Sequence, residues 1–141
     1  MKKIIGTFLV VAALISLSFS AFAGDNKPVG KVIAYYFHST FRCSTCTTME
    51  KYISEVIEAD FKDALSSGKL EFKVVNIEEQ GNEHFARDYK LYTKSLVLSL
   101  VKDGKEVKSE NLTKIWEYAR DKQEFFDYVS EEVNNFLKET Q

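Results

Sequence analysis

The sequence predicts an α/β domain built on a mixed four-stranded sheet, with helices on both faces and the element order β-α-β-α-β-β-α. Three observations predict this fold. Residues 32–37 are continuously apolar, as in a strand that is covered on both faces. A long amphipathic helix pattern follows, and Asp103-Gly104, between two later strand patterns, is typical of a tight hairpin.

The first half of the domain contains two strand patterns separated by the long helix pattern. Apolar residues recur every three or four positions from Met49 to Leu65, which predicts an amphipathic helix with a break near Asp60. Gly68 can adopt the left-handed conformation that ends such a helix. Residues 70–77 predict a second strand. Because two strands joined by a crossover helix form a right-handed parallel unit, we expect them to pair in parallel.

The second half of the domain adds a short helix and a hairpin. Asn82 stands where a side chain caps a helix, and the short helix it predicts carries Phe85 and Tyr89. Residues 96–101 predict a third strand. Since Asp-Gly tolerates the positive φ angles of a type I′ turn, residues 106–109 are expected to return antiparallel as an edge strand.

A final helix pattern completes the domain. Asn111 is expected to cap a short segment that places Trp116 in the core, and Asp121, with Glu124 three residues later, to cap the last helix. The apolar face of this helix consists of Phe125, Phe126, Val129, Val133, Phe136 and Leu137.

The N-terminal residues predict a signal peptide rather than part of the fold. Lysines at positions 2 and 3 precede the apolar run 4–17, and alanines at 21 and 23 provide the small residues of a cleavage site. We therefore expect residues 1–23 to be removed after Ala23 and residues 24–141 to form one domain, exported by a bacterium to the periplasm or the medium. The alternative is an uncleaved anchor, because the apolar stretch approaches the ~20 residues that span a bilayer.

Composition limits the class of partner. Without the signal peptide the chain has 17 basic and 21 acidic residues, a net charge of about −4. The charges are interspersed without a basic run, which argues against nucleic acid as a partner. After cleavage no membrane partner is expected either, and the remaining length suits a single domain with a real core.

The only two cysteines, Cys43 and Cys46, lie three positions apart between the first strand pattern and the long helix pattern. A structural staple is the simplest interpretation for an exported protein. However, closing so short a loop contributes only about 2 kcal/mol, before any strain is subtracted. Their place at a helix start is more typical of reactive thiols.

A helix N-terminus favours a thiolate, because its free N–H groups and the positive end of the helix dipole stabilise negative charge. Arg42 adds a cation beside Cys43. Lowering a thiol pKa from ~8.5 to ~7 makes about half of it thiolate at neutral pH. We expect Cys43 to attack a partner protein's disulfide and Cys46 to resolve the mixed disulfide. The redox-active disulfide is then the only cofactor expected.

Three other interpretations remain open. His38, Cys43 and Cys46 together offer three ligands for zinc, copper or arsenite. The pair could also be an inert bridge, or the chain could be a non-catalytic partner subunit.

His38 has two further possible roles besides binding a metal: it could assist proton transfer or cap the end of the strand. Glu50, one turn beyond Cys46, is expected to be a solvated charge, with a proton-accepting role as the alternative.

The span from Lys31 to Gln141 resembles the thioredoxin superfamily, with Cys43 and Cys46 at the positions of its active-site pair. A CxxC motif alone is a moderate signal, but a βαβ unit around it and a later Asp-Gly hairpin strengthen it. The resemblance implies a thioredoxin-like fold and thiol–disulfide oxidoreductase activity.

A narrower resemblance covers most of the exported domain. Its motifs are residues 36–38 (Tyr-Phe-His), 41–46 (Phe-Arg-Cys-Ser-Thr-Cys), 82–85 (Asn-Glu-His-Phe) and 89–96 (Tyr-Lys-Leu-Tyr-Thr-Lys-Ser-Leu). They are similar to an exported bacterial family called nitrophenyl compound nitroreductase subunit, or ArsF-like. This implies an accessory subunit linked to nitroaromatic reduction or arsenic resistance, although no flavin or other nitroreductase site is visible in the sequence.

The sequence departs from ordinary thioredoxins at two positions. Its only proline is Pro28, so the cis-proline that faces the cysteines in that superfamily is replaced by Ser95 or Leu96. Because that proline helps to hold substrate and discourages metal binding, its absence favours the metal interpretation. The strand position of the superfamily's buried acid corresponds to Phe37, and no internal proton acceptor replaces it.

Overall fold

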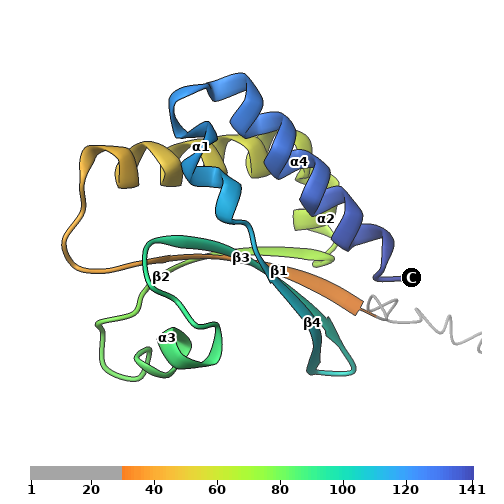
Figure 1. Ribbon diagram of the computed structural model, residues 1–141. Helices are drawn as coiled ribbons and strands as arrows, with labels where there is room; N and C mark the ends of the chain where they lie inside the picture. Colours follow the sequence, from red (N-terminus) through yellow and green to blue (C-terminus); the bar gives the residue numbers. More distant parts are fainter. Residues whose placement is uncertain (1–29) are drawn as a thin grey trace, which may run out of the picture.

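The computed structural model describes residues 30–141, so the predicted signal peptide lies outside the described residues. The elements follow the predicted order: β1 (Gly30–His38), α1 (Ser44–Asp60), α2 (Lys62–Ser66), β2 (Leu70–Asn76), α3 (His84–Asp88), β3 (Ser95–Lys102), β4 (Lys105–Asn111), the 3-10 turns η1 (Thr113–Trp116) and η2 (Tyr118–Arg120), and α4 (Lys122–Lys138). Figure 1 shows α1, α2 and α4 on one face of the sheet and α3 on the other.

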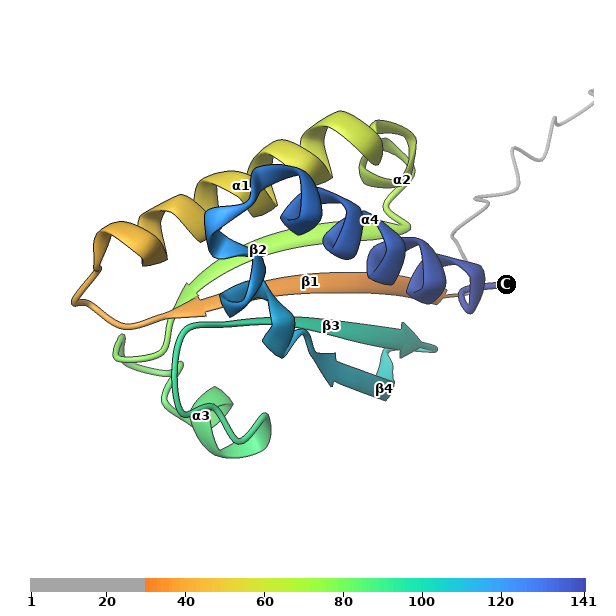
Figure 2. The ribbon, with the colours of Figure 1, turned by 45° about the horizontal axis from the view of Figure 1, so that its top comes forward.

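The four strands form one mixed sheet in the order β2-β1-β3-β4. β1 pairs in parallel with β2 and antiparallel with β3, and β3 pairs antiparallel with β4. Figure 2 shows that α1, which connects β1 to β2 in the chain, runs back over one face of the sheet. The predicted βαβ unit and the antiparallel edge are both confirmed.

The turns confirm the predicted role of particular residues. Asp103 and Gly104 have φ angles of 50° and 76°, as the type I′ turn between β3 and β4 requires. The long helix is interrupted at Phe61, where the predicted break separates α1 from α2. Gly68, just after α2, has a φ of 73°, a conformation that costs glycine little.

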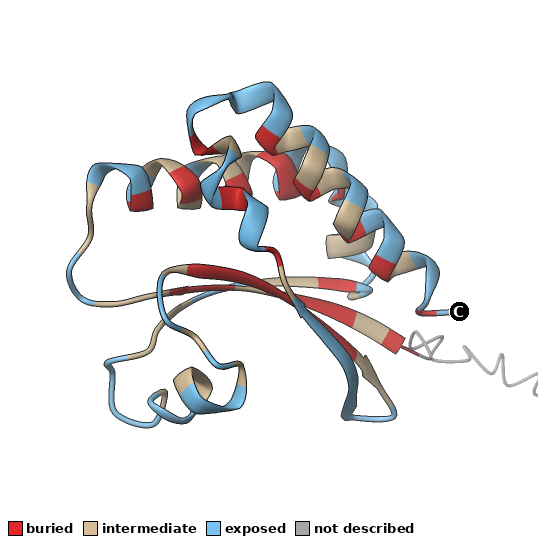
Figure 3. Ribbon diagram, in the orientation of Figure 1, coloured by how far each residue is buried: buried red, intermediate tan, exposed pale blue. Residues whose placement is uncertain are grey.

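The core lies between the sheet and the pair α1 and α4. Because side chains alternate along a strand, Val32, Ala34 and Tyr36 of β1 face these helices. Figure 3 shows the buried residues of both helices on the side facing the sheet. The other core members are Met49, Ile53, Val56 and Ile57 of α1, Leu96, Leu98 and Leu100 of β3, and Phe125, Val129, Val133 and Phe136 of α4.

Aromatic side chains fill the opposite face of the sheet. Tyr35 and Phe37 stack with their ring centroids 5.3 Å apart. Phe37 also lies 5.1 Å from the ring of Phe85 in α3 and 5.5 Å from that of Tyr89. β1 is therefore covered on both faces, as its continuous apolar sequence predicts.

Two of the predicted helix caps are wrong. α3 begins at His84 without a side-chain cap, and Asn82 donates its amide hydrogen to the carbonyl of Asn76 instead. Asn111 is the last residue of β4 and donates to the Ser95 hydroxyl. In both cases a partner outside the local helix satisfies the side chain.

The last helix begins as predicted, but the expected core position of Trp116 is wrong. The carboxylate of Asp121 accepts hydrogen bonds from the N–H groups of Gln123 and Glu124, both at 3.0 Å. Trp116 is 38% exposed because its indole N–H reaches the carbonyl of Lys94 at the surface. Over residues 30–141 the structure contains no helix with the length and apolar character to cross a membrane.

Candidate active site

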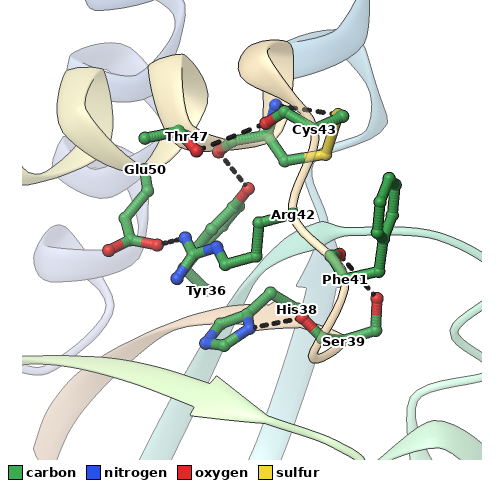
Figure 4. Close-up of polar contacts among 9 residues, drawn as sticks. Tyr36, His38, Ser39, Phe41, Arg42, Cys43, Thr47 and Glu50 are labelled. Atoms are coloured by element: carbon green, nitrogen blue, oxygen red, sulfur yellow. Dashed lines mark hydrogen bonds and ion pairs between the residues drawn. A yellow bond between two sulfur atoms is a disulfide. The ribbon is translucent and has the colours of Figure 1, made fainter.

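Cys43 and Cys46 form a disulfide at the N-terminus of α1 (Figure 4). Their Cα atoms lie 5.1 Å apart. Cys43 is the N-cap residue of the helix, with extended backbone angles, and its Sγ accepts a hydrogen bond from the N–H of Cys46 at 3.2 Å. One sulfur thus occupies the place of a capping oxygen, where the free N–H groups of the helix favour negative charge.

The two sulfurs differ in their access to solvent. Cys43 is half-buried, whereas Cys46 is only 1% exposed and belongs to the buried face of α1. A partner molecule can therefore reach Cys43 first. Cys46 is placed to attack Cys43 from within the protein.

The loop that carries Cys43 is tied to the end of β2. The N–H of Thr40 donates to a carboxylate oxygen of Glu78 at 2.9 Å, and Asn76 donates to the Thr40 hydroxyl at 3.2 Å. The hydrogen bond from the Thr40 backbone holds the pKa of Glu78 below its usual value. Because β2 pairs in parallel with β1, the fold itself brings Glu78 beside this loop.

Tyr36 lies beneath the disulfide, a position that the sequence analysis assigned to no polar group (Figure 4). Its hydroxyl donates a hydrogen bond to the carbonyl of Cys46 at 2.8 Å. Burial raises the pKa of Tyr36 to about 12, against a smaller lowering by the Arg42 charge. Phe37, the position that corresponds in the sequence to the superfamily's buried acid, packs against Phe85 on the α3 face.

Replacing Tyr36 with phenylalanine tests this arrangement. The loss of one buried hydrogen bond is expected to lower the free energy of unfolding by about 1 kcal/mol at pH 7. Since burial raises the pKa of Tyr36 above its unfolded value of about 10, its stabilising effect is present below pH 10 and is lost towards pH 12. Urea unfolding should therefore show that the free energy of unfolding falls less between pH 7 and pH 11 in Tyr36→Phe than in the wild type. Tyr92→Phe, at an exposed position, is the control; identical alkaline losses in wild type and Tyr36→Phe would contradict the prediction.

Arg42 and Glu50 form an ion pair under the first turn of α1. In Figure 4 the guanidinium group of Arg42 points towards Glu50 and away from the disulfide. Each side chain is 29% exposed, and the facing atoms, Nη2 and Oε2, are buried. The expectation of a solvated Glu50 is therefore wrong. Arg42 adjoins Cys43 in the chain, but its charge is directed to the inner side of the helix.

His38 does not join the cysteines in a three-residue cluster. Its Nδ1 lies 2.9 Å from the carbonyl oxygen of Ser39, so it serves the loop at the end of β1. In residues 30–141 the structure contains no group of three or more His, Cys, Asp or Glu side chains that could hold a metal ion. His38 also borders a small pocket of about 130 Å³, together with Ser39, Ile77, Leu91, Tyr92, Thr93 and Lys94.

Of the two candidates for the missing proline position, Leu96 lies on the disulfide side of the sheet. It pairs with Tyr36 in the β1–β3 register, and both belong to the core under α1. Ser95 is buried at the start of β3, and its hydroxyl is hydrogen-bonded to Thr93 and Asn111. These hydrogen bonds fix the start of β3.

The hydrogen bond of Tyr36 beneath the disulfide was not predicted from the sequence, and Glu50 was considered only as an alternative proton acceptor. Alternation along β1 does place Tyr36 on the face of Val32 and Ala34, which was the available signal. The spacing from Cys46 drew attention to Glu50, but not to its ion pair, because the partner Arg42 lies in the loop before the helix.

No protein-family model and no curated protein matches the chain. Among solved structures, it is similar to a thioredoxin from Thermus thermophilus, with 21% identity, 72% of each chain covered and a TM-score of 0.45. It is also similar to Trxlp from Edwardsiella tarda (14% identity, 73% of this chain and 85% of that one, TM-score 0.44). Fasciola hepatica thioredoxin is 25% identical, with 67% of this chain and 83% of that one covered and a TM-score of 0.40.

These similarities are distant, and no chemistry of this chain follows from them. The architecture is carried by the strand order β2-β1-β3-β4, the parallel β1–β2 pair and the antiparallel hairpin. The chain therefore has a thioredoxin-like fold, with its CxxC pair at the start of the helix that follows the central strand β1.

Proposed function

We propose that the protein is a thiol–disulfide oxidoreductase that exchanges electrons with a partner protein through Cys43 and Cys46. The observation that carries the proposal is the hydrogen bond from the Cys46 N–H to the Cys43 Sγ at the helix N-cap. This site stabilises a thiolate on the more accessible of the two sulfurs.

The exchange proceeds in two substitutions at sulfur. In the reduced protein the Cys43 thiolate attacks one sulfur of the partner's disulfide; a mixed disulfide forms and the partner's other sulfur leaves as a thiolate, which takes up a proton. The thiol of Cys46 loses a proton to solvent and attacks the Cys43 sulfur. The partner then leaves as a dithiol, and the protein holds the Cys43–Cys46 disulfide. Two electrons pass to the partner, and the reverse sequence oxidises a dithiol.

Reduction of insulin disulfides by dithiothreitol provides the direct test. Reduced protein at micromolar concentration is expected to accelerate the reaction well above the uncatalysed rate, with the dithiol regenerating the protein after each turnover. Wild-type protein that leaves the rate unchanged, with either insulin or a small disulfide, would contradict the proposal.

Phe41 is the proposed contact for the partner protein. It lies two residues before Cys43 and its side chain is 77% exposed, so a partner that reaches Cys43 can contact it. We expect Phe41→Ala to slow insulin reduction about tenfold, because an exposed aromatic at an interface often contributes more than 1 kcal/mol. The rate with a small aromatic disulfide should change less than twofold. Val107→Ala, which alters an exposed apolar residue on the edge strand β4, serves as the control. Equal losses with both substrates would count against a docking role.

We further propose that the protein acts outside the cytoplasm, as the signal-peptide pattern in residues 1–23 predicts. An oxidising compartment suits a protein whose only cysteines form a disulfide. The intact mass of protein recovered from the periplasm or medium tests this proposal, and a chain beginning at Gly24 is expected. Full-length chain confined to the cytoplasm would contradict it.

The narrower proposal, an accessory subunit in nitroaromatic reduction or arsenic resistance, rests on the sequence resemblance alone. A deletion strain complemented with wild type or a Cys43→Ser/Cys46→Ser double variant tests it. Loss of arsenite tolerance or nitrophenyl reduction only in the variant supports a role of the dithiol. Full function of the cysteine-free variant would instead favour a non-catalytic subunit.

A further inference from the structure

The ion pair of Arg42 and Glu50 places two opposite charges under the turn that carries the disulfide. The facing atoms Nη2 and Oε2 are buried, and the Nε of Arg42 is buried without a hydrogen-bond partner. Solvent and salt screen such charges less than they screen exposed ones. The pair therefore acts on its surroundings as two fixed charges that nearly cancel.

A short chain of contacts joins this pair to the cysteines. The charge of Arg42 opposes the rise in the pKa of Tyr36, so it acts at the Tyr36 hydroxyl. That hydroxyl donates to the carbonyl of Cys46 at 2.8 Å. Glu50 lies four residues after Cys46, one turn further along the same side of α1. Both charges are thus next to the inner side of the CxxC turn.

Few other charged or titratable groups face this place among the described residues. Glu78 lies at the outer side of the loop before Cys43, where it accepts a hydrogen bond from the Thr40 N–H. β1 contributes Tyr36 and His38, whose ring centroids lie 6.4 Å apart, and the loop and α1 contribute the ion pair itself. The other carboxylates of α1 are engaged elsewhere: Glu55 with Lys51 and Lys122, Glu58 with the hydroxyl of Ser54, and Asp60 with the hydroxyl of Ser130.

We propose that Arg42 and Glu50 act in opposite directions on the reduction potential of the Cys43–Cys46 couple, with Glu50 cancelling the attraction of Arg42 for the reduced sulfurs. The inference rests on the proposed function, in which this couple is redox-active. Reduction of the disulfide takes up two electrons and, where one thiol stays ionised, one proton, so the reduced form carries an added negative charge. Arg42 favours that form and Glu50 disfavours it. Both are positioning residues and neither touches the partner.

Opposite shifts of the potential are the expected signature. Each variant is equilibrated with glutathione; two glutathione molecules, with one thiol each, supply the two electrons and become one glutathione disulfide. The oxidised fraction of the protein is read from its intact mass. Glu50→Gln should favour the reduced form about tenfold more than wild type does, equivalent to about +30 mV, the scale of one uncompensated charge. Arg42→Met should favour the oxidised form by a similar factor. In the double variant the ratio of reduced to oxidised protein should return to within about twofold of the wild-type ratio.

Two controls separate charge from packing. Glu58→Gln removes an exposed carboxylate from the same helix and should leave the potential unchanged, and Arg42→Lys, which keeps the charge, should stay near wild type. If Arg42→Met fails to fold, these two variants and Glu50→Gln still decide the question. Equal potentials for Glu50→Gln, Glu58→Gln and wild type, or shifts of Glu50→Gln and Arg42→Met in the same direction, would overturn the inference. The measurement needs no partner protein, so shifted potentials in a chain that cannot reduce insulin would contradict the proposed function alone.

Discussion

Cys43→Ser is expected to abolish catalysed insulin reduction, with a loss of at least about a thousandfold, as for the removal of other catalytic nucleophiles. The reason is positional as well as chemical. Cys43 is the sulfur that the Cys46 N–H stabilises, and it is the one that a partner can reach. Serine at the N-cap still accepts a hydrogen bond, so the helix should start at the same residue and stability should change little. The activity loss then reports the thiol itself.

Cys46→Ser should behave differently, because it keeps the attacking thiol and removes the resolving one. A protein disulfide offered to this variant is expected to accumulate as a one-to-one covalent adduct at Cys43, visible by non-reducing electrophoresis and intact mass. Turnover should fall to the rate at which free dithiothreitol releases the adduct. Wild-type protein alkylated at its thiols is the control for complete inactivation.

The two single variants together decide the assignment of roles. Adducts on Cys43→Ser but not on Cys46→Ser would show that Cys46 is the attacking sulfur and Cys43 the resolving one. Undiminished turnover in both variants would end the oxidoreductase proposal. The burial of Cys46, 1% exposed against a half-buried Cys43, argues for the order proposed here.

Elements set by local periodicity could be predicted from the sequence, and contacts set by remote partners could not. The apolar run of β1, the amphipathic α1 and the Asp103-Gly104 turn each depend on neighbouring residues, and all three are confirmed. The side chains of Asn82 and Asn111 also suit helix caps, but the fold brings them the Asn76 carbonyl and the Ser95 hydroxyl. Such partners are chosen only when the strands pair.

The features of the site also fall into those that local spacing predicts and those that depend on contacts between distant parts of the chain. The spacing of Cys43 and Cys46 before a helix pattern was sufficient to predict the disulfide and its helix N-terminus. The residue of β1 that lies beneath the disulfide was not predicted, because neighbouring residues of a strand point to opposite faces and the register was not known. Tyr36 occupies the place, while Phe37 packs under α3. The Arg42–Glu50 pair required the path of the loop, which residue spacing does not give.

Phe125→Ala is expected to produce the largest loss of stability, about 3–5 kcal/mol. Phe125 is fully buried in α4, and its ring meets that of Tyr52 in α1 edge to face, with centroids 5.5 Å apart. This contact joins the C-terminal helix to the helix that carries the disulfide. A domain of this size has a free energy of unfolding of about 5–15 kcal/mol, so the loss is a large fraction of the total.

The neighbouring Phe126 provides a matched control. It is only partly buried, although its ring lies 5.9 Å from Tyr52 and the ammonium group of Lys122 lies 5.0 Å from its centre. Phe126→Ala should therefore lower the free energy of unfolding by about 1–2 kcal/mol. In urea unfolding of the oxidised proteins, Phe125→Ala should unfold at a clearly lower urea concentration than Phe126→Ala, with a similar dependence of the free energy on urea concentration. If the two variants unfold at the same urea concentration, α4 does not hold α1 through Phe125. In the folded Phe125→Ala protein the reduction potential of the cysteine couple should stay near wild type, because neither the hydrogen bond from the Cys46 N–H nor the Arg42–Glu50 ion pair involves Phe125.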